Sequence, residues 1–209
     1  MNLQTLQSRS LLAGPERFEV RLAGRGGQGL IKMGLILAEA AVREGKKVVQ
    51  LQSYGSEPRG GLSRSDVIIG SEDIDYPGVL MLDVLLSLDQ QAYDDNLPLL
   101  KPDGLVIFDS DMVKPKLLAG AQHPVPFTRI AEELGDRTCA NSVALGYFVA
   151  VTEIVGKETV EEVMAESLAG KLPQMMVEIN LKAFNRGYAE GYARNHDRAT
   201  VMQKVQHMC

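Results

Sequence analysis

Residues 17–45 read RFEVRLAGRGGQGLIKMGLILAEAAVREG, and this stretch decides the fold. Residues 17–23 alternate apolar and polar side chains as a β-strand does, and the glycine cluster at residues 24–29 ends that pattern. Residues 30–45 are apolar on almost every face, and Gly45 is a typical C-terminal stop for a helix. A strand, a glycine turn and a buried helix in this order predict the first unit of an α/β sheet.

The rest of the chain continues this alternation and then becomes helical. Short, mostly aliphatic runs predict further strands at residues 46–53, 62–70, 83–89 and 104–110, and a helix is expected to begin near Gln90. Helical periodicity dominates residues 140–155, 158–168 and 173–194. We therefore predict an α/β fold with a Rossmann-like open, mostly parallel sheet flanked by helices and a helical C-terminal third. The domain is expected to span residues 17–194, between an N-terminal arm (1–16) and a polar C-terminal tail (195–209).

The last predicted helix has one apolar stripe, at steps of three or four residues, formed by Val177, Leu181, Phe184, Tyr188 and Tyr192. Such a stripe indicates a buried face. Packing within this chain is the favoured interpretation, and a contact with another subunit is the alternative.

The composition indicates an ordinary globular protein, with 45% hydrophobic residues, 23% charged residues and a net charge of -5 over 209 residues. No basic stripe is present, which argues against nucleic-acid binding. Neither a signal peptide nor an apolar stretch of transmembrane length is recognisable, so we expect a cytoplasmic protein without a membrane segment.

Cysteine and histidine are too scattered to predict a metal site. Cys139 and Cys209 are the only cysteines and no CxxC spacing exists, so metal redox chemistry is expected on another chain. His123, His196 and His207 lie beside polar or proline residues and are expected to be exposed, without a functional role.

The glycine cluster GRGGQG contains the pattern GxGxxG between a strand and a helix, which is the context of phosphate-binding turns. A dinucleotide site also needs an acidic residue near the end of the second strand, and residues 48–53 read VVQLQS. The missing acid argues against a nicotinamide or flavin site. The glycines could serve tight packing alone, with Gln28 bonded to a neighbouring loop, or they could bind an anionic or polar group.

A second polar cluster, SYGSEPRGGLSRS, occupies residues 53–65 at the end of the second predicted strand. It is either a solvated turn with a weak Glu57–Arg59 pair, contributing under about 1 kcal/mol, or a binding loop, which we favour. Loops after the first and second strands of a parallel sheet leave the same edge, so the two clusters should lie side by side. No nucleophile–base pair is visible in them, and we predict no catalytic residue and no metal ligand on this chain.

These clusters, GRGGQG and SYGSEPRGG followed by LSRSDVII, closely resemble the gamma subunit of the 2-oxoacid:ferredoxin oxidoreductases. The similarity continues through NSVALGYFVAVTEIVG and LPQMMVEINLKAFNRGYAEGY and covers about residues 17–192. The sequence of residues 53–61 most closely resembles that of the 2-oxoglutarate enzymes. Pyruvate, 2-oxoisovalerate and indolepyruvate relatives remain alternatives, as does a free-standing nucleotide-binding oxidoreductase.

The resemblance implies a subunit that is inactive alone and shapes a site completed by alpha and beta chains, with a ferredoxin-like delta chain in some complexes. Thiamine diphosphate, magnesium and iron–sulfur clusters are expected on those partners, coenzyme A as a possible contact of this chain, and ferredoxin as the electron acceptor. The anionic groups of coenzyme A, or a carboxylate of a partner, are expected at the amides of residues 26–29 and at Arg59. Asn141, at the start of the first long helix, is expected to be a helix cap. The candidate ligand- or partner-binding residues are Gly24, Gly26, Gly27, Gln28, Gly29, Ser53, Tyr54, Gly55, Glu57, Arg59, Gly60, Gly61 and Ser63.

Overall fold

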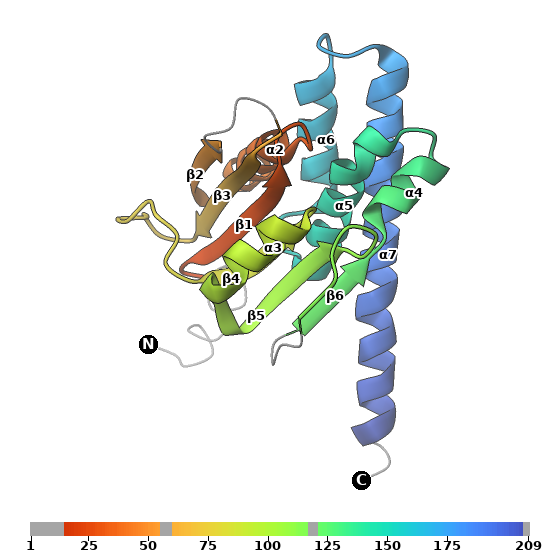
Figure 1. Ribbon diagram of the computed structural model, residues 1–209. Coiled ribbons are helices and arrows are strands. Elements are labelled where there is room, and N and C mark those ends of the chain that lie inside the picture. Colours follow the sequence, from red (N-terminus) through yellow and green to blue (C-terminus); the bar gives the residue numbers. More distant parts are fainter. Residues whose placement is uncertain (1–14, 55–59, 117–120, 207–209) are drawn as a thin grey trace, which may run out of the picture.

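The computed structural model describes residues 15–54, 60–116 and 121–206, and these form a sheet with helices on both faces (Figure 1). The strands are β1 (Phe18–Arg25), β2 (Lys47–Tyr54), β3 (Leu62–Gly70), β4 (Leu82–Ser87), β5 (Leu100–Asp109) and β6 (Ala121–Val125). The helices are α2 (Leu30–Arg43), α3 (Gln90–Asn96), α4 (Phe127–Glu133), α5 (Ala140–Thr152), α6 (Lys157–Leu168) and α7 (Gln174–Gln206). Two short 3-10 turns, η1 (Leu97–Leu99) and η2 (Arg137–Cys139), complete the described elements.

The strand order is β2-β3-β1-β4-β5-β6. β1, β4, β5 and β6 pair in parallel, whereas β3 is antiparallel to both β1 and β2, so β2 runs in the same direction as β1. The predicted mostly parallel sheet is confirmed, with β3 as the one reversed strand among those described. Residues 55–61 are too few for a parallel crossover, which takes about a dozen residues or more, so the chain returns antiparallel.

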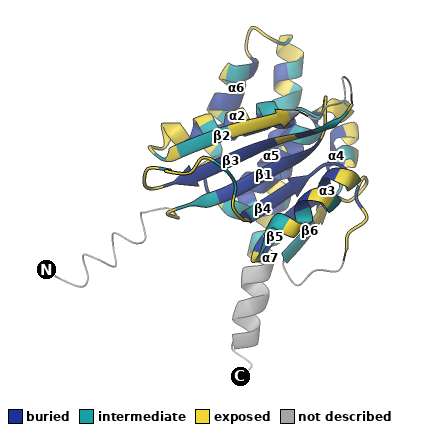
Figure 2. Cartoon of the chain, turned by 60° about the vertical axis from the view of Figure 1, so that its left-hand side comes forward, coloured by how far each residue is buried: buried dark blue, intermediate teal, exposed yellow. Residues whose placement is uncertain are grey.

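The two faces of the sheet are covered unequally. A large core lies between one face and helices α2, α4, α5, α6 and α7, while a smaller core on the other face packs beneath α3. In the smaller core the rings of Tyr93 and Phe108 meet edge to face at 5.5 Å. Figure 2 shows the buried central strands and the more exposed β2 at the edge of the sheet. Because α2 and α3 follow β1 and β4 on opposite faces, the connections diverge between these two strands, which is where open α/β sheets bind ligands.

Helices α5 and α7 cross unusually closely because glycines form the contact. A methyl group on Gly146 would lie 1.9 Å from the Phe184 carbonyl oxygen, and one on Gly187 would lie 1.9 Å from the Val143 carbonyl oxygen. The predicted apolar stripe of α7 follows this contact. Phe184 is fully buried, whereas Tyr192 is 49% exposed and stacks on His196. The stripe therefore packs within this chain over its first half and emerges at the surface toward its C-terminal end.

Several boundaries differ from the prediction. β6 and α4 were not predicted, and α7 continues to Gln206, beyond residue 194 where the sequence placed the end of the domain. His123 was expected to be exposed, and that prediction is wrong. It lies in β6, is 2% exposed, and its Nδ1 lies 3.0 Å from the Tyr147 hydroxyl. In the described part of the chain no helix combines the length and the apolar character needed to cross a membrane.

Candidate functional site

The glycine turn begins where β1 ends and finishes at Gly29, the N-cap of α2. Gly27 and Gly29 have φ angles of 94° and 74°, in the left-handed region that other residues adopt at a cost. The amide of Gly26 donates to the Gly61 carbonyl at 2.8 Å, and the amide of Gln28 donates to the Arg25 carbonyl at 3.2 Å. Among the described residues the amides of Gly27 and Gly29 have no acceptor. Two amides of the turn thus hold the fold, and the other two make no such bond within the described part of the chain.

The turn and the end of the second loop lie side by side, as predicted. Besides the bond from Gly26 to Gly61, Gly24 pairs with Ser63 in the β1–β3 ladder. The Arg25 guanidinium donates from Nη1 to the Gly60 carbonyl at 3.2 Å. Two successive carbonyls of the second loop therefore face the end of β1. Gly55, Glu57, Arg59 and the side chain of Tyr54 lie outside the described residues.

The side chain of Gln28 bridges the crevice between the ends of β1 and β4. Its Oε1 accepts from the Arg25 amide at 2.6 Å, and its Nε2 donates to the Leu88 carbonyl, just after β4, at 3.1 Å. The side-chain amide is thereby committed to two backbone groups. The interpretation in which Gln28 bonds a neighbouring loop is confirmed, and its polar atoms serve the architecture of the site.

Asp89 joins the same network from the start of α3. Its Oδ1 accepts from the amides of Gln91 and Ala92, capping the helix, and its Oδ2 accepts from Arg25 Nε at 2.8 Å. Asp89 is 8% exposed, so both carboxylate oxygens are used in a nearly buried position. Arg25 and Asp89 were not predicted as site residues. The sequence signal was available, since Arg25 is the only charged residue of the glycine cluster.

A cavity of about 210 Å³ lies beside the glycine turn and is lined in part by Gly27 and Gln28. It opens at the carboxyl edge of the parallel strands, between the turn, the end of β5 and the start of α5. Its lining mixes polar and apolar groups and comprises Gly27, Gln28, Leu88, Asp109, Met112, Thr128, Arg137, Thr138, Ala140 and Asn141. Cavities at this edge of α/β sheets are the usual ligand positions.

Asn141 belongs to this cavity, and its prediction as a helix cap is wrong. The N-cap of α5 is Cys139, and Asn141 Oδ1 accepts from the adjacent Ser142 amide at 2.9 Å. Its side-chain nitrogen packs on the glycine turn, since a methyl group on Gly29 would lie 2.2 Å from it. Because the 3-10 turn η2 leads directly into α5, the helix begins at Ala140 and not at Asn141. Asn141 therefore lies in the first turn of the helix, where it faces Gly29.

Asp109 forms the floor of the cavity and is 1% exposed. Its Oδ2 accepts from the Thr128 amide and hydroxyl, and its Oδ1 accepts from the Asp111 amide. Burial raises the pKa of the Asp109 carboxyl, and the hydrogen bonds from Thr128 and Asp111 partly oppose that rise. With its oxygens committed to local donors, Asp109 fixes the start of α4 and is not poised as a base.

Ser53 and Ser63 lie elsewhere. They line a separate cavity of about 230 Å³ between the end of β2, the start of β3 and α3, together with Leu62, Arg64, Ala92, Asp95 and Asn96. Directly behind it, Arg21 binds Asp66 through two hydrogen bonds of 2.6 and 2.7 Å in the buried part of the sheet. The structure thus divides the predicted site, with Gly27 and Gln28 on one cavity and the two serines on another.

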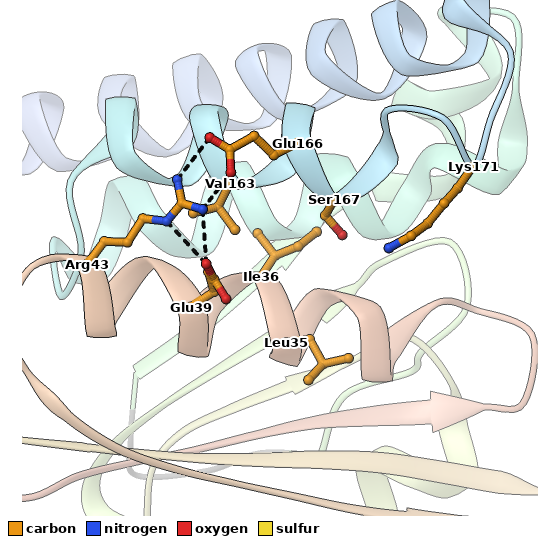
Figure 3. A pocket seen from close by; sticks show the side chains of 8 residues that line it. All are labelled: Leu35, Ile36, Glu39, Arg43, Val163, Glu166, Ser167 and Lys171. Atoms are coloured by element: carbon orange, nitrogen blue, oxygen red, sulfur yellow. Dashed lines mark hydrogen bonds and ion pairs between the residues drawn. The ribbon is translucent and has the colours of Figure 1, made fainter.

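A third cavity, of about 390 Å³, lies between α2 and α6 (Figure 3). Arg43 crosses it and is held by Glu39 of its own helix and by Glu166 of α6, at 2.9 and 2.6 Å. These hydrogen bonds raise the pKa of the Arg43 guanidinium. The Arg43 guanidinium is already occupied by two carboxylates, so it is not free to bind an anionic ligand.

The described residues include neither a cluster of metal ligands nor a reactive thiol. No group of three or more histidine, cysteine or carboxylate side chains that could hold a metal occurs among them. Cys139 is buried, and burial, reinforced by the Asp136 charge, raises the pKa of its thiol to about 11, which makes it a poor nucleophile. The geometry of the glycine turn and the cavity beside it is compatible with an anionic or polar group.

The chain has an α/β fold with a glycine turn at the carboxyl edge of its sheet. The family described as pyruvate ferredoxin/flavodoxin oxidoreductase matches residues 19–190, so the chain belongs to that family. It is 44% identical over 177 residues to the 2-oxoglutarate synthase subunit KorC of Methanocaldococcus jannaschii, covering 82% of this chain and 92% of that subunit. The predicted resemblance to the gamma subunits is thereby confirmed.

Two solved structures share the fold. The gamma subunit of a keto/oxoacid ferredoxin oxidoreductase from Geobacter sulfurreducens PCA is 40% identical, with a TM-score of 0.73 over 84% of this chain and 99% of that one. The 2-oxoglutarate:ferredoxin oxidoreductase from Magnetococcus marinus, solved with 2-oxoglutarate, coenzyme A and succinyl-CoA, is 28% identical with a TM-score of 0.79. There the match covers 86% of this chain but 32% of the other, so the same fold also occurs within a much longer chain.

Proposed function

We propose that this chain is the gamma subunit of a 2-oxoglutarate:ferredoxin oxidoreductase, a complex that converts 2-oxoglutarate and coenzyme A to succinyl-CoA and carbon dioxide while reducing ferredoxin. The observation that carries the proposal is the match to a 2-oxoglutarate synthase subunit over nearly that subunit's whole length.

The partners in this proposal are separate alpha and beta subunits, and a ferredoxin-like delta subunit where the complex has one. Support comes from the longer Magnetococcus marinus chain, in which the corresponding domain is joined to other parts of the enzyme. A free-standing homologue must make the equivalent contacts as a subunit. Thiamine diphosphate, magnesium and iron–sulfur clusters are assigned to those partners, and a cytoplasmic location follows from the use of coenzyme A and ferredoxin.

Coenzyme A is the ligand proposed for this chain, and it supplies the thiol that accepts the acyl group. The amides of Gly27 and Gly29, together with Arg59 on the neighbouring loop, are the groups assigned to its anionic parts. Fixed backbone donors at the start of a helix suit diffuse negative charge without the entropy cost of ordering a long side chain. The remaining predicted residues of the two loops shape the surface around these donors.

The proposal is tested by purifying the complex from its native source through a tag on this chain. Mass spectrometry should find thiamine-dependent and iron–sulfur partners. A panel of 2-oxoglutarate, pyruvate, 2-oxoisovalerate and indolepyruvate, with coenzyme A and a viologen acceptor, should show preference for 2-oxoglutarate. Recovery of the chain alone, or activity confined to another 2-oxoacid, contradicts the assignment.

The coenzyme A contact needs its own variant. Replacing Arg59 with Ala should raise the KM for coenzyme A and leave assembly intact, because the substitution removes the guanidinium assigned to an anionic group of the ligand. Arg186→Ala is the matched control, since that arginine pairs with Glu190 on the surface of α7, far along the chain from both loops. Unchanged coenzyme A dependence in a normally assembled Arg59→Ala complex removes Arg59 from the ligand site.

A further inference from the structure

Arg25 is the one charged side chain in the glycine cluster, and its contacts reach three different segments. Its amide donates to Gln28 within the turn, its Nε binds Asp89 at the start of α3, and its Nη1 binds the Gly60 carbonyl. These partners are distant from Arg25 in the sequence, Asp89 by 64 residues and Gly60 by 35. The Arg25 side chain therefore links segments that are not neighbours along the chain. A planar guanidinium with several fixed donors suits such a junction, whereas a lysine offers a single charged point.

The anchor for this junction is Asp89. Because its Oδ1 already caps α3 and its Oδ2 is oriented toward Arg25, the carboxylate is held in one direction. The anchor fixes the guanidinium, and the guanidinium in turn fixes Gly60, whose φ of 73° is in the left-handed region. The next carbonyl, that of Gly61, is held by Gly26. The unused amide of Gly27 thus follows directly after a residue that is tied to the second loop.

We propose that Arg25 is the positioning residue of the coenzyme A surface, holding the glycine turn, the start of α3 and the Gly60–Gly61 backbone in one fixed arrangement through Asp89. This inference rests on the proposed function. Arg25 acts through the backbone it orders, and the ligand contacts belong to other groups. Its side chain is 46% exposed, so as an ion pair alone it adds little to stability, and its effect should fall on ligand binding.

The test uses the assembled complex with Arg25→Gln, Arg25→Lys and Asp89→Asn. Asp89→Asn keeps an oxygen that can cap α3 and removes the charge pair. The matched control is Arg43→Gln, which likewise removes an arginine paired with carboxylates, here Glu39 and Glu166, but lies in the separate cavity between α2 and α6 (Figure 3). Binding of coenzyme A is measured directly by calorimetry, alongside KM and kcat and the native mass of each complex.

The expected result for Arg25→Gln is a Kd and a KM for coenzyme A raised roughly tenfold, which corresponds to the loss of one well-oriented interaction, with kcat within about twofold of wild type. Asp89→Asn should show a smaller rise of the same kind, Arg25→Lys should recover part of the affinity, and Arg43→Gln should match wild type.

Wild-type affinity in Arg25→Gln, an equal loss in Arg43→Gln, or failure of both Arg25 variants to assemble overturns the proposal. If the wild-type complex itself binds no coenzyme A, the proposed function fails instead.

Discussion

The left-handed glycines of the turn allow backbone strain to be separated from steric contact at neighbouring positions. Gly27 and Gly29 both have positive φ angles. A methyl group on Gly27 would meet nothing within 4 Å, whereas one on Gly29 would lie 2.2 Å from Asn141 Nδ2. Gly27→Ala should therefore report strain alone, and Gly29→Ala should report strain together with displacement of Asn141.

The magnitudes follow from these contacts. A left-handed alanine costs about 1–2 kcal/mol, which is the full expected loss for Gly27→Ala. In Gly29→Ala the Asn141 side chain must also turn away and give up its bond to the Ser142 amide, and such a bond is worth about 1 kcal/mol. The total for Gly29→Ala is therefore about 2–3 kcal/mol.

Urea denaturation followed by circular dichroism measures both losses, and a double-mutant cycle with Asn141→Ala divides them. In the Gly29→Ala background the second substitution should remove the steric part, giving a coupling of about 1 kcal/mol. In the Gly27→Ala background the coupling should be near zero. Equal losses for the two glycines, or no coupling between Gly29 and Asn141, refute the packing of Asn141 on the turn.

Two further predictions concern the core. Gly187→Ala should destabilise the fold by about 2 kcal/mol, because its methyl group would meet the Val143 carbonyl at 1.9 Å and the overpacking exceeds the roughly 1 kcal/mol gain in helix propensity. Urea denaturation beside an exposed control, Lys182→Ala, measures it, and a more stable Gly187→Ala protein contradicts the close crossing of α5 and α7. For Cys139, the folded thiol keeps its proton up to a pKa of about 11 while the unfolded thiol ionises near 9.0, so the free energy of unfolding should fall across that pH window. The fall should be smaller in Cys139→Ala, and identical pH profiles would show that the thiol is not buried in this way.

The sequence predicted those parts of the fold that depend on local pattern. The helix at residues 30–45 was recognisable because its apolar residues and its glycine stop are contiguous, and α2 ends within two residues of that range. β6 was not predicted, because Pro124 interrupts a short segment that would otherwise read as a strand. Proline is tolerated there because β6 is an edge strand. The same misassignment made His123 look like a surface residue.

The candidate site was only partly predictable, for a different reason. The adjacency of the two loops followed from the shared direction of β1 and β2, which strand pattern and connection length indicate. The start of α3 near Gln90 was predicted, but the bond from Arg25 to Asp89 and the packing of Asn141 on Gly29 are not specified by local sequence. Tertiary contacts between segments far apart in the chain decide such positions.

The glycine turn has the position of a dinucleotide cradle but uses its groups differently. In a cradle the amides of the turn and the crevice beside it receive the ligand. Here the Gly26 amide binds the second loop, and Gln28 bridges the crevice to the Leu88 carbonyl. Some of the groups that would hold a dinucleotide instead bind the protein, and they tie the turn to the second loop and to the segment after β4. A surface tied together in this way suits the proposed role, in which the ligand reacts on another chain and the surface must hold its shape while that chain supplies the reacting groups.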